Sequence, residues 1–182
     1  MRLYNGKPLL NSVSGKDESL AKVLPLVKKY GAVVVGLALD DDGIPATAAG
    51  RLAIAEKIIA SAAEYGIEKR NIIIDPLALT ISTGPDNAAV DLEVIRKLAE
   101  QKIKTIMGVS NISFGLPSRD AVNSTFFTLA MEAGLSCAII NPQSKAMLDA
   151  YYAYRALKGL DEGCTAYVKR FADSGNKVPA AA

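Results

Sequence analysis

The chain has 182 residues, half of them hydrophobic and 22% charged, with a net charge of +2. This length is enough for one sizeable core, and the small charge, without any dense basic stretch, argues against nucleic acid as a partner. No apolar run approaches the roughly 18 residues that a membrane helix needs, so we expect no membrane association. Two cysteines do not make a disulfide framework and favour a reducing, cytoplasmic location.

The chain contains no histidine. Histidine is the commonest general base and metal ligand, so Ser-His-Asp and Cys-His mechanisms are excluded and no metal site is expected. Any chemistry must therefore depend on carboxylates, amides, lysines or a cofactor held elsewhere.

Five short apolar segments predict strands, and a segment with helical periodicity follows each one. The strands are expected at 9–10, 33–39, 72–74, 104–108 and 138–140, and the helices at 16–30, 47–65, 86–101, 118–133 and 144–158. Small or acidic residues precede these helices and glycines often follow them, as is typical of helix ends. A short amphipathic helix is expected at 161–171, and residues 172–182 are expected to form a flexible tail or linker.

The alternation of strands and helices predicts an α/β fold with an all-parallel sheet. Two architectures fit this pattern: a complete, doubly wound sheet, or part of a (β/α)8 TIM barrel, which five strands cannot close. Periodicity alone does not distinguish them. Only Met1–Lys7 precede the first predicted strand, so any further units of a barrel would lie upstream.

Polar residues follow each predicted strand at its carboxyl end, where parallel α/β folds bind ligands. One such residue could be only a turn former, but repetition along the chain makes the signal stronger. The residues concerned are Asn11, Asp40, Asp75, Asn111 and Asn141.

Asp75 stands in the sequence Ile-Ile-Ile-Asp-Pro, where Pro76 favours an extended conformation for Asp75 and keeps its carboxylate at the rim of the sheet. A carboxylate that only accepts hydrogen bonds suits a ligand with paired N–H donors, such as an amidine or aminopyrimidine edge. The alternative is that Asp75 caps its own loop or pairs with a neighbouring side chain.

The amides of Asn11 and Asn111 can each donate and accept, and Asn111 could hydrogen-bond a ring nitrogen in either protonation state. Local turn chemistry is the alternative for both. Gly108 either lets a flat ligand approach the backbone or relieves crowding inside a barrel.

Three motifs of the sequence resemble a known family. Leu-Leu-Asn-Ser at 9–12, Ile-Asp-Pro-Leu at 74–77 and Gly-Val-Ser-Asn-Ile-Ser-Phe-Gly-Leu-Pro at 108–117 are similar to the pterin-binding methyltransferase domain of cobalamin-dependent methionine synthase. The wider family includes the methyltetrahydrofolate:corrinoid/iron-sulfur protein methyltransferases and, more remotely, dihydropteroate synthase. The resemblance extends from about residue 4 to residue 171.

This resemblance implies a TIM barrel of which residues 1–171 form the C-terminal part, about the last five βα units. It implies that the pterin of methyltetrahydrofolate lies at the carboxyl end of the strands, and that its methyl group passes from N5 to cob(I)alamin on another domain or protein. Asn111 would be the catalytic residue and hydrogen-bond N5. The substrate-binding residues would be Asn11 and Asp75 on the pterin, Gly108 and Ser110 lining its pocket, and Ile139 as an apolar wall.

The family's barrel has three further βα units before the strand that matches residues 8–11, and none of them is in this sequence. The chain is therefore expected to act as part of a methyltransferase, with an upstream piece completing the barrel. The alternatives are a truncated, non-catalytic pterin-binding fragment, a dihydropteroate-synthase-like protein, or a complete doubly wound sheet that binds another small molecule.

Overall fold

The structure, a computed structural model, describes residues 3–172. Its five strands form one parallel sheet in the order β1-β2-β3-β4-β5. They are β1 (Leu9–Ser14), β2 (Val33–Leu37), β3 (Ile72–Asp75), β4 (Lys104–Gly108) and β5 (Cys137–Ile139). All five predicted strands and their parallel arrangement are thus confirmed.

A helix follows each strand, as the periodicity predicts. The main helices are α1 (Asp17–Tyr30), α2 (Ala48–Glu64), α3 (Asn87–Glu100), α4 (Arg119–Ala133), α5 (Lys145–Leu157) and α6 (Thr165–Ala172). Three short 3-10 segments are η1 (Lys69–Asn71), η2 (Val109–Ser113) and η3 (Glu162–Cys164). The expected tail at 172–182 lies, except for its first residue, outside the described residues.

Only some of the predicted helix caps form. The hydroxyls of Thr47 and Ser144 accept backbone N–H groups in the first turns of α2 and α5. Asp86 and Ser118 make no such side-chain bond, so the cap predicted from these residue types is wrong for α3 and α4, and α1 follows Lys16, which is neither small nor acidic. No described helix has both the length and the apolar character required to cross a membrane.

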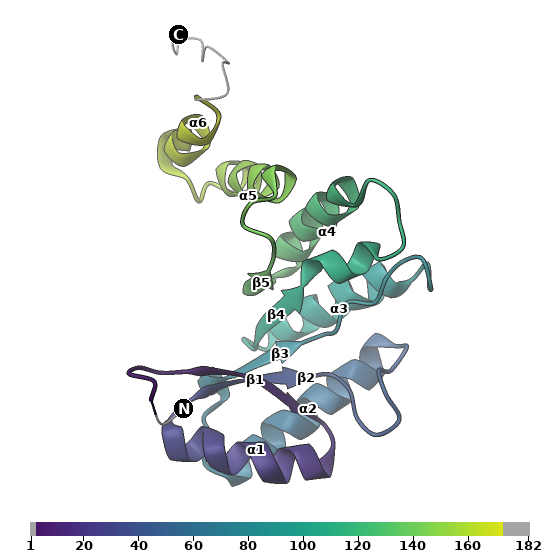
Figure 1. Cartoon of the computed structure of the whole chain (residues 1–182), viewed down its shortest axis with the longest axis vertical. Coiled ribbons are helices and arrows are strands. Elements are labelled where there is room, and N and C mark those ends of the chain that lie inside the picture. Colours follow the sequence, from purple (N-terminus) through teal and green to yellow (C-terminus); the bar gives the residue numbers. More distant parts are fainter. Residues whose placement is uncertain (1–2, 173–182) are drawn as a thin grey trace.

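The order of the strands distinguishes the two architectures left open by the sequence. The spatial order equals the chain order, and the helices lie on one face of the curved sheet while the other face stays open (Figure 1). A doubly wound sheet reverses its strand order and carries helices on both faces. The fold is therefore a partial barrel, and the doubly wound alternative is wrong.

Two apolar clusters hold the helices on the outer face of the sheet. One lies beneath β1–β3 and is built on residues such as Leu24, Ile58 and Ile74, and the other lies beneath β4 and β5 with Met107 and Phe127 among its members. Burial of this outer face is the main stabilising contribution to the fold. It orients the alternate residues of each strand toward the open face.

The open face of the sheet carries both apolar and polar side chains. Leu9 is 50% exposed and Ile139 is 51% exposed on the two outermost strands. Asn11 on β1 is exposed and Asp75 on β3 is partly exposed. In a closed barrel this face would line the interior.

The first strand is longer than the sequence indicates. Asn11 was expected to end it, but β1 continues to Ser14, and its register with β2 shifts between Asn11 and Val13. Beyond this shift Val13 turns into the core, with 1% exposure. Because polar Asn11 faces the open side of the sheet, its polarity does not mark the end of the strand.

Two other strand boundaries differ slightly from those predicted. β2 ends at Leu37 because the Leu39 N–H turns back to the Leu37 carbonyl, 2.8 Å away. β5 spans Cys137–Ile139, one residue earlier than expected.

Candidate functional site

Asp75 is the last residue of β3 and begins a tight turn at the rim of the sheet. Its Oδ1 accepts the Leu77 backbone N–H at 2.8 Å, and Leu77 adopts a left-handed conformation with φ 67°. Burial raises the pKa of the Asp75 carboxyl to about 6, although the Leu77 N–H opposes this shift. The carboxyl group is thus partly shielded from water. At such a position a hydrogen bond from an N–H group is stronger than at the surface.

The two carboxyl oxygens of Asp75 serve different purposes. Oδ1 caps the turn, which was the alternative weighed from the sequence. Oδ2 has no hydrogen-bond partner among the described residues. A ligand with N–H donors can therefore bind this oxygen without breaking the turn.

Asn111 lies in η2, the 3-10 segment that follows β4. Its backbone carbonyl accepts the Phe114 N–H at 3.3 Å, and its partly buried side-chain amide makes no hydrogen bond within residues 3–172. The amide group packs against Gly108, where an added Cβ would come within 3.2 Å of Asn111 Nδ2. Gly108 therefore leaves room for this amide.

Ser110 and the loop around it are held by Arg119, the first residue of α4. The guanidinium donates to the Ser110 carbonyl at 2.8 Å and to the Ser113 hydroxyl at 2.9 Å, and it stacks on Phe114 at 4.7 Å. Ser113 in turn donates to Asn123 at 2.7 Å. These contacts fix the backbone beneath Asn111 while its side chain stays free.

A small polar cleft of about 230 Å³ opens beside this loop. It lies at the carboxyl ends of β4 and β5 and is lined by Ser110, Arg119, Asp120, Asn123, Ile140, Asn141, Ser144 and Met147. The cleft joins the end of β4 to the first turn of α5.

The remaining predicted site residues lie on the open face of the sheet. Gly108 and Ile139 are paired in the register of β4 and β5. Asn11 is two strands away from Asp75. It is in register with Val35 of β2, whereas Asp75 is in register with Leu37, so Asn11 lies one layer of side chains further from the carboxyl ends of the strands. The fold thus brings Asp75, Gly108, Ser110, Asn111 and Ile139 to three adjacent strand ends, with Asn11 deeper and further along the sheet.

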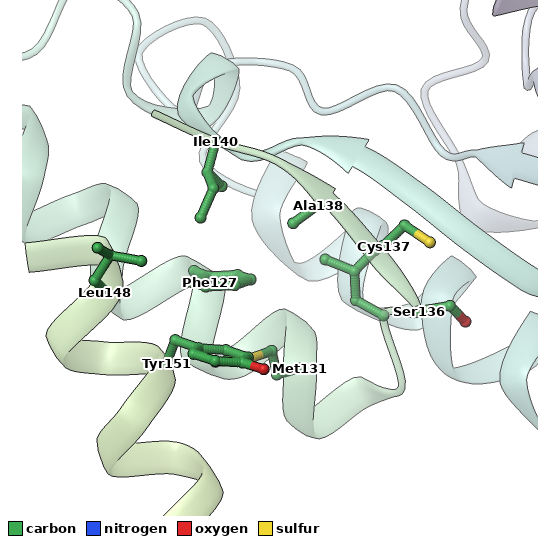
Figure 2. A pocket seen from close by; sticks show the side chains of 9 residues that line it. Phe127, Met131, Ser136, Cys137, Ala138, Ile140, Leu148 and Tyr151 are labelled. Atoms are coloured by element: carbon green, nitrogen blue, oxygen red, sulfur yellow. The ribbon is translucent and has the colours of Figure 1, made fainter. Parts of the chain in front are cut away.

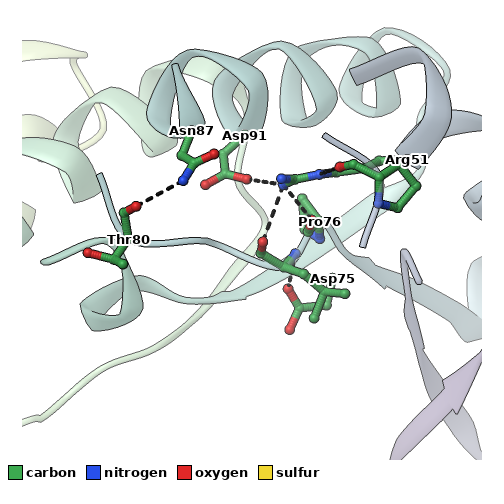
Figure 3. A network of polar contacts seen from close by, with 8 residues as sticks. Arg51, Asp75, Pro76, Thr80, Asn87 and Asp91 are labelled. Atoms are coloured by element: carbon green, nitrogen blue, oxygen red, sulfur yellow. Dashed lines mark hydrogen bonds and ion pairs between the residues drawn. The ribbon is translucent and has the colours of Figure 1, made fainter. Parts of the chain in front are cut away.

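A buried ion pair beneath Asp75 was not anticipated from the sequence. Arg51 of α2 and Asp91 of α3 have fully buried side chains, with Arg51 Nη1 and Asp91 Oδ1 2.5 Å apart (Figure 3). Burial raises the pKa of Asp91 to about 7, against the opposing effect of the Arg51 guanidinium. A signal did exist, because both residues occupy positions in the apolar helical repeat of their helices, where charge is unusual.

An apolar pocket of about 290 Å³ lies away from these strand ends, between β5, α4 and α5 (Figure 2). Phe127, Leu148 and Tyr151 line it from the helices, and the sulfur of Cys137 points away from them. Since this pocket is on the helix-covered side of the sheet, it is separate from the site at the rim.

Among residues 3–172, no three His, Cys, Asp or Glu side chains are grouped as a metal site requires. Both cysteines are free. At the rim, the Asp75 carboxylate offers hydrogen-bond acceptors and the unpaired Asn111 amide offers both a donor and an acceptor, which suits the polar edge of a flat heterocycle.

Comparison with known proteins assigns the chain to a family. Residues 2–141 match the model of the pterin binding enzyme family. This stretch covers more than half of the chain and contains all the predicted site residues. The chain belongs to the pterin-binding enzymes.

The chain is also similar to a curated methyltransferase and to a curated methionine synthase. It is 34% identical over 168 residues to the methylcorrinoid:tetrahydrofolate methyltransferase of Eubacterium limosum, covering 90% of this chain and 62% of that protein. It is 37% identical over 150 residues to the methionine synthase of Mycobacterium tuberculosis, covering 75% of this chain and 13% of that protein. The chain thus spans less than two thirds of the curated relatives that it matches.

Solved structures agree on the fold. The dihydropteroate synthase of Xanthomonas albilineans in complex with 7,8-dihydropteroate has a TM-score of 0.62 at 18% identity, over 82% of this chain and 60% of that one. The dihydropteroate synthase of Yersinia pestis gives a TM-score of 0.62 at 15% identity. These similarities establish the partial TIM-barrel fold.

Proposed function

We propose that this chain binds methyltetrahydrofolate at the carboxyl ends of β3–β5 and takes part in methyl transfer between its N5 atom and a corrinoid. One observation carries the proposal: Asp75 ends β3, Asn111 lies in the 3-10 segment that follows the neighbouring β4, and each keeps a polar group without a partner among the described residues. The names of two relatives, a methylcorrinoid:tetrahydrofolate methyltransferase 34% identical and a methionine synthase 37% identical to this chain, support this reaction over other uses of a pterin.

Asp75 is proposed to anchor the pterin ring. Its free Oδ2 would accept N–H groups from the aminopyrimidine edge, and these bonds are strongest when the carboxyl group is ionised. The partly desolvated position favours such a partner, because a buried carboxylate without one is costly. The Leu77 N–H bonds to Oδ1, so Oδ2 remains for the ligand.

Asn111 is proposed as the catalytic residue. In the transfer, the bond from N5 to the methyl carbon breaks and its electron pair stays on N5, while the acceptor's electron pair forms the new bond to carbon. N5 leaves far better when it is protonated, and an amide that both donates and accepts can bind N5 with or without that proton. Asn111 would stabilise the charge that develops there.

The remaining predicted residues are proposed to shape the site. Gly108 gives Asn111 and a flat ring space, Ser110 lines the pocket, Ile139 offers an apolar wall and Asn11 is a second amide for the pterin. Their placement on the open face or at its rim is compatible with these roles.

The corrinoid is proposed to come from another domain or protein. The chain has no histidine, and residues 3–172 hold no metal-ligand cluster that could carry it. When bound, the corrinoid supplies the centre that exchanges the methyl group with N5. The relative from Eubacterium limosum is named for a methylcorrinoid and tetrahydrofolate, and the same two contacts would serve transfer in either direction.

The open face of the sheet is proposed to be covered by further βα units. Closing an eight-stranded barrel takes three more strands, and the chain covers 60% of the matching dihydropteroate synthase chain. Leu9 and Ile139, both half-exposed on the outermost strands, would pack inside such a barrel. The covering units can belong to the same polypeptide or to another one. A cytoplasmic location, expected from the two free cysteines, fits a folate enzyme.

A second candidate function is pterin binding without catalysis. It is favoured by the same open face, because a site with one side uncovered does not exclude water from the reacting atoms. In that case the chain binds the ligand but transfers no methyl group until the barrel is closed.

Calorimetric titration of the purified chain with methyltetrahydrofolate tests the proposal. We expect saturable binding that Asp75→Ala weakens about 10- to 100-fold, the loss of one or two charge-assisted hydrogen bonds. Asp86→Ala, which removes an exposed carboxylate from the loop before α3, should bind like the wild type. Equal binding by Asp75→Ala would contradict the site, and no binding by the folded wild-type chain would contradict its ability to bind alone.

A further inference from the structure

The turn that carries Asp75 is held from below by one side chain. Arg51 Nη1 lies 3.0 Å from the Pro76 carbonyl and 3.2 Å from the Leu77 carbonyl, and Arg51 Nε donates to the Pro45 carbonyl at 2.9 Å. Figure 3 shows the guanidinium between the Asp75 turn and Asp91. One planar group therefore joins two loops and helix α3.

Leu77 is the residue of the turn that most needs to be held. It adopts a left-handed conformation, which is unfavourable for a residue that carries a Cβ atom. Its N–H is bound by Asp75 Oδ1 and its carbonyl by Arg51 Nη1. The direction of the Asp75 carboxylate and the conformation of Leu77 are thus fixed together, from both sides of one residue.

Stability alone does not explain this ion pair. Removing two charges from water is costly, and buried pairs can often be replaced by apolar residues of similar volume without loss of stability. Here the pair also leaves Arg51 Nη2 and Asp91 Oδ2 without hydrogen-bond partners in the described part of the chain. An apolar replacement could fill the space, but it could not bind two successive carbonyl groups.

We infer that Arg51 and Asp91 are positioning residues, which fix the Asp75–Pro76–Leu77 turn so that the free oxygen of Asp75 is directed to the ligand. Arg51 holds the turn, and Asp91 orients the guanidinium and balances its charge. The consequence for ligand affinity rests on the proposed pterin-binding role of Asp75, whereas the effect on the turn does not.

Two variants separate positioning from stability. Arg51→Lys keeps a buried charge beside Asp91, but its ammonium nitrogen ends one bond short of the position of Nη1, which contacts both carbonyls, and it has no counterpart of the Nε that binds Pro45. The double variant Arg51→Met with Asp91→Leu removes the pair and fills the space without leaving a lone charge. Lys57→Met is the matched control, because it removes an exposed ion pair of the same helix with Asp17.

Amide hydrogen exchange of Leu77, measured by NMR on the complete chain, reports the turn directly. We expect both variants to lose about tenfold or more of the protection of this amide, while the amide of Val35 in β2 stays protected. Calorimetry should show methyltetrahydrofolate binding about tenfold weaker, and Lys57→Met should change neither quantity.

Each result decides a separate question. Unchanged Leu77 protection and unchanged affinity in a folded Arg51→Lys would overturn the inference, whatever the double variant does. A loss of protection at Val35 equal to that at Leu77 would also overturn it, because the pair would then stabilise the whole fold. If the wild type itself bound no methyltetrahydrofolate, the proposed function would fail while the exchange of Leu77 would still test the turn.

Discussion

The carboxyl ends of β3 and β4 each present one of the two polar side chains proposed to bind the ligand, but the structure holds these side chains differently. At the end of β3, Asp75 uses one oxygen to build its own turn, and the fully buried Arg51 binds that turn from below. At the end of β4, Asn111 contributes nothing from its side chain to the loop, which the partly exposed Arg119 holds through the Ser110 carbonyl.

The two roles proposed here, an anchor at Asp75 and a catalytic amide at Asn111, need different support from the backbone. An anchor must point in one direction, so a carboxylate bonded into its own turn is suitable. The role proposed for Asn111, to bind N5 with or without its proton, requires a side-chain amide without protein hydrogen bonds on a fixed backbone. The two loops are also joined, because the Ile81 N–H donates to the Ile112 carbonyl at 3.0 Å.

The largest expected effect comes from removing the free amide at the β4 end. Asn111→Ala should lower the rate of methyl transfer about 10²- to 10³-fold in a barrel closed by the further βα units proposed above, because a donor to the developing charge is lost. Binding of methyltetrahydrofolate should change much less. Single-turnover transfer to a reduced corrinoid, followed by its absorbance, measures the rate.

The control for this change is Asn71→Ala, which removes an amide at the opposite end of β3. It should transfer at the wild-type rate. If Asn111→Ala weakened binding as strongly as it slowed transfer, both strand ends would be anchors and the contrast between them would be lost.

A smaller effect is expected from neutralising the carboxylate at the β3 end. Burial raises the pKa of Asp75 from 3.8 to about 6, so the folded state holds its proton more tightly than the unfolded chain. The contribution of Asp75 to the stability of the wild type therefore falls as pH rises from about 4 to about 6. Above this range it no longer changes with pH. Asp75→Asn should be more stable than the wild type at pH 8, by an amount on the order of 2 kcal/mol.

Urea unfolding at pH 4, 6 and 8 measures this difference, which should shrink as pH falls through 6 and disappear near 4. The same variant should bind the pterin more weakly, since its amide is not an acceptor-only group. Equal stability of the two proteins at pH 8 would show that the buried carboxylate costs the fold nothing.

The smallest effect is expected at the support of the β4 loop. Arg119→Met removes the hydrogen bonds to Ser110 and Ser113, and we expect a loss of about 1 kcal/mol in the free energy of unfolding. Ser113 keeps its bond to Asn123, so transfer should slow less than in Asn111→Ala. Urea unfolding and single-turnover assays on one preparation test both statements, and a rate as low as that of Asn111→Ala would show that Arg119 itself takes part.

Much of the fold followed from patterns that are local in the chain. Apolar runs and helical repeats predicted five strands and their helices, since burial on a helix-covered sheet imposes those periods. The positions of Asp75 and Asn111 at the rim also followed, because Asp75 ends one apolar segment and Asn111 comes shortly after another. The motifs at 74–77 and 108–117 carried the resemblance to the pterin-binding family, which the comparisons confirm.

Other features depended on contacts between distant segments. Asn11 looked like the end of a strand, but the shift of register against β2 carries the strand on to Ser14. The pairing of Arg51 with Asp91 spans 40 residues and joins two helices, so neither helical pattern alone reveals it. The choice between a barrel and a doubly wound sheet also required the order of the strands in space.

The sequence by itself determined the α/β class, the family and the types of polar side chain at the rim. Burial patterns, turn chemistry and motifs depend on residues that are close together in the chain. Only the tertiary structure decided that the sheet is a partial barrel with an open face, that Asp75 keeps one free oxygen, and that Arg51 holds its turn. These features arise where separate segments meet, and the geometry of their meeting is set by the packing of the whole core.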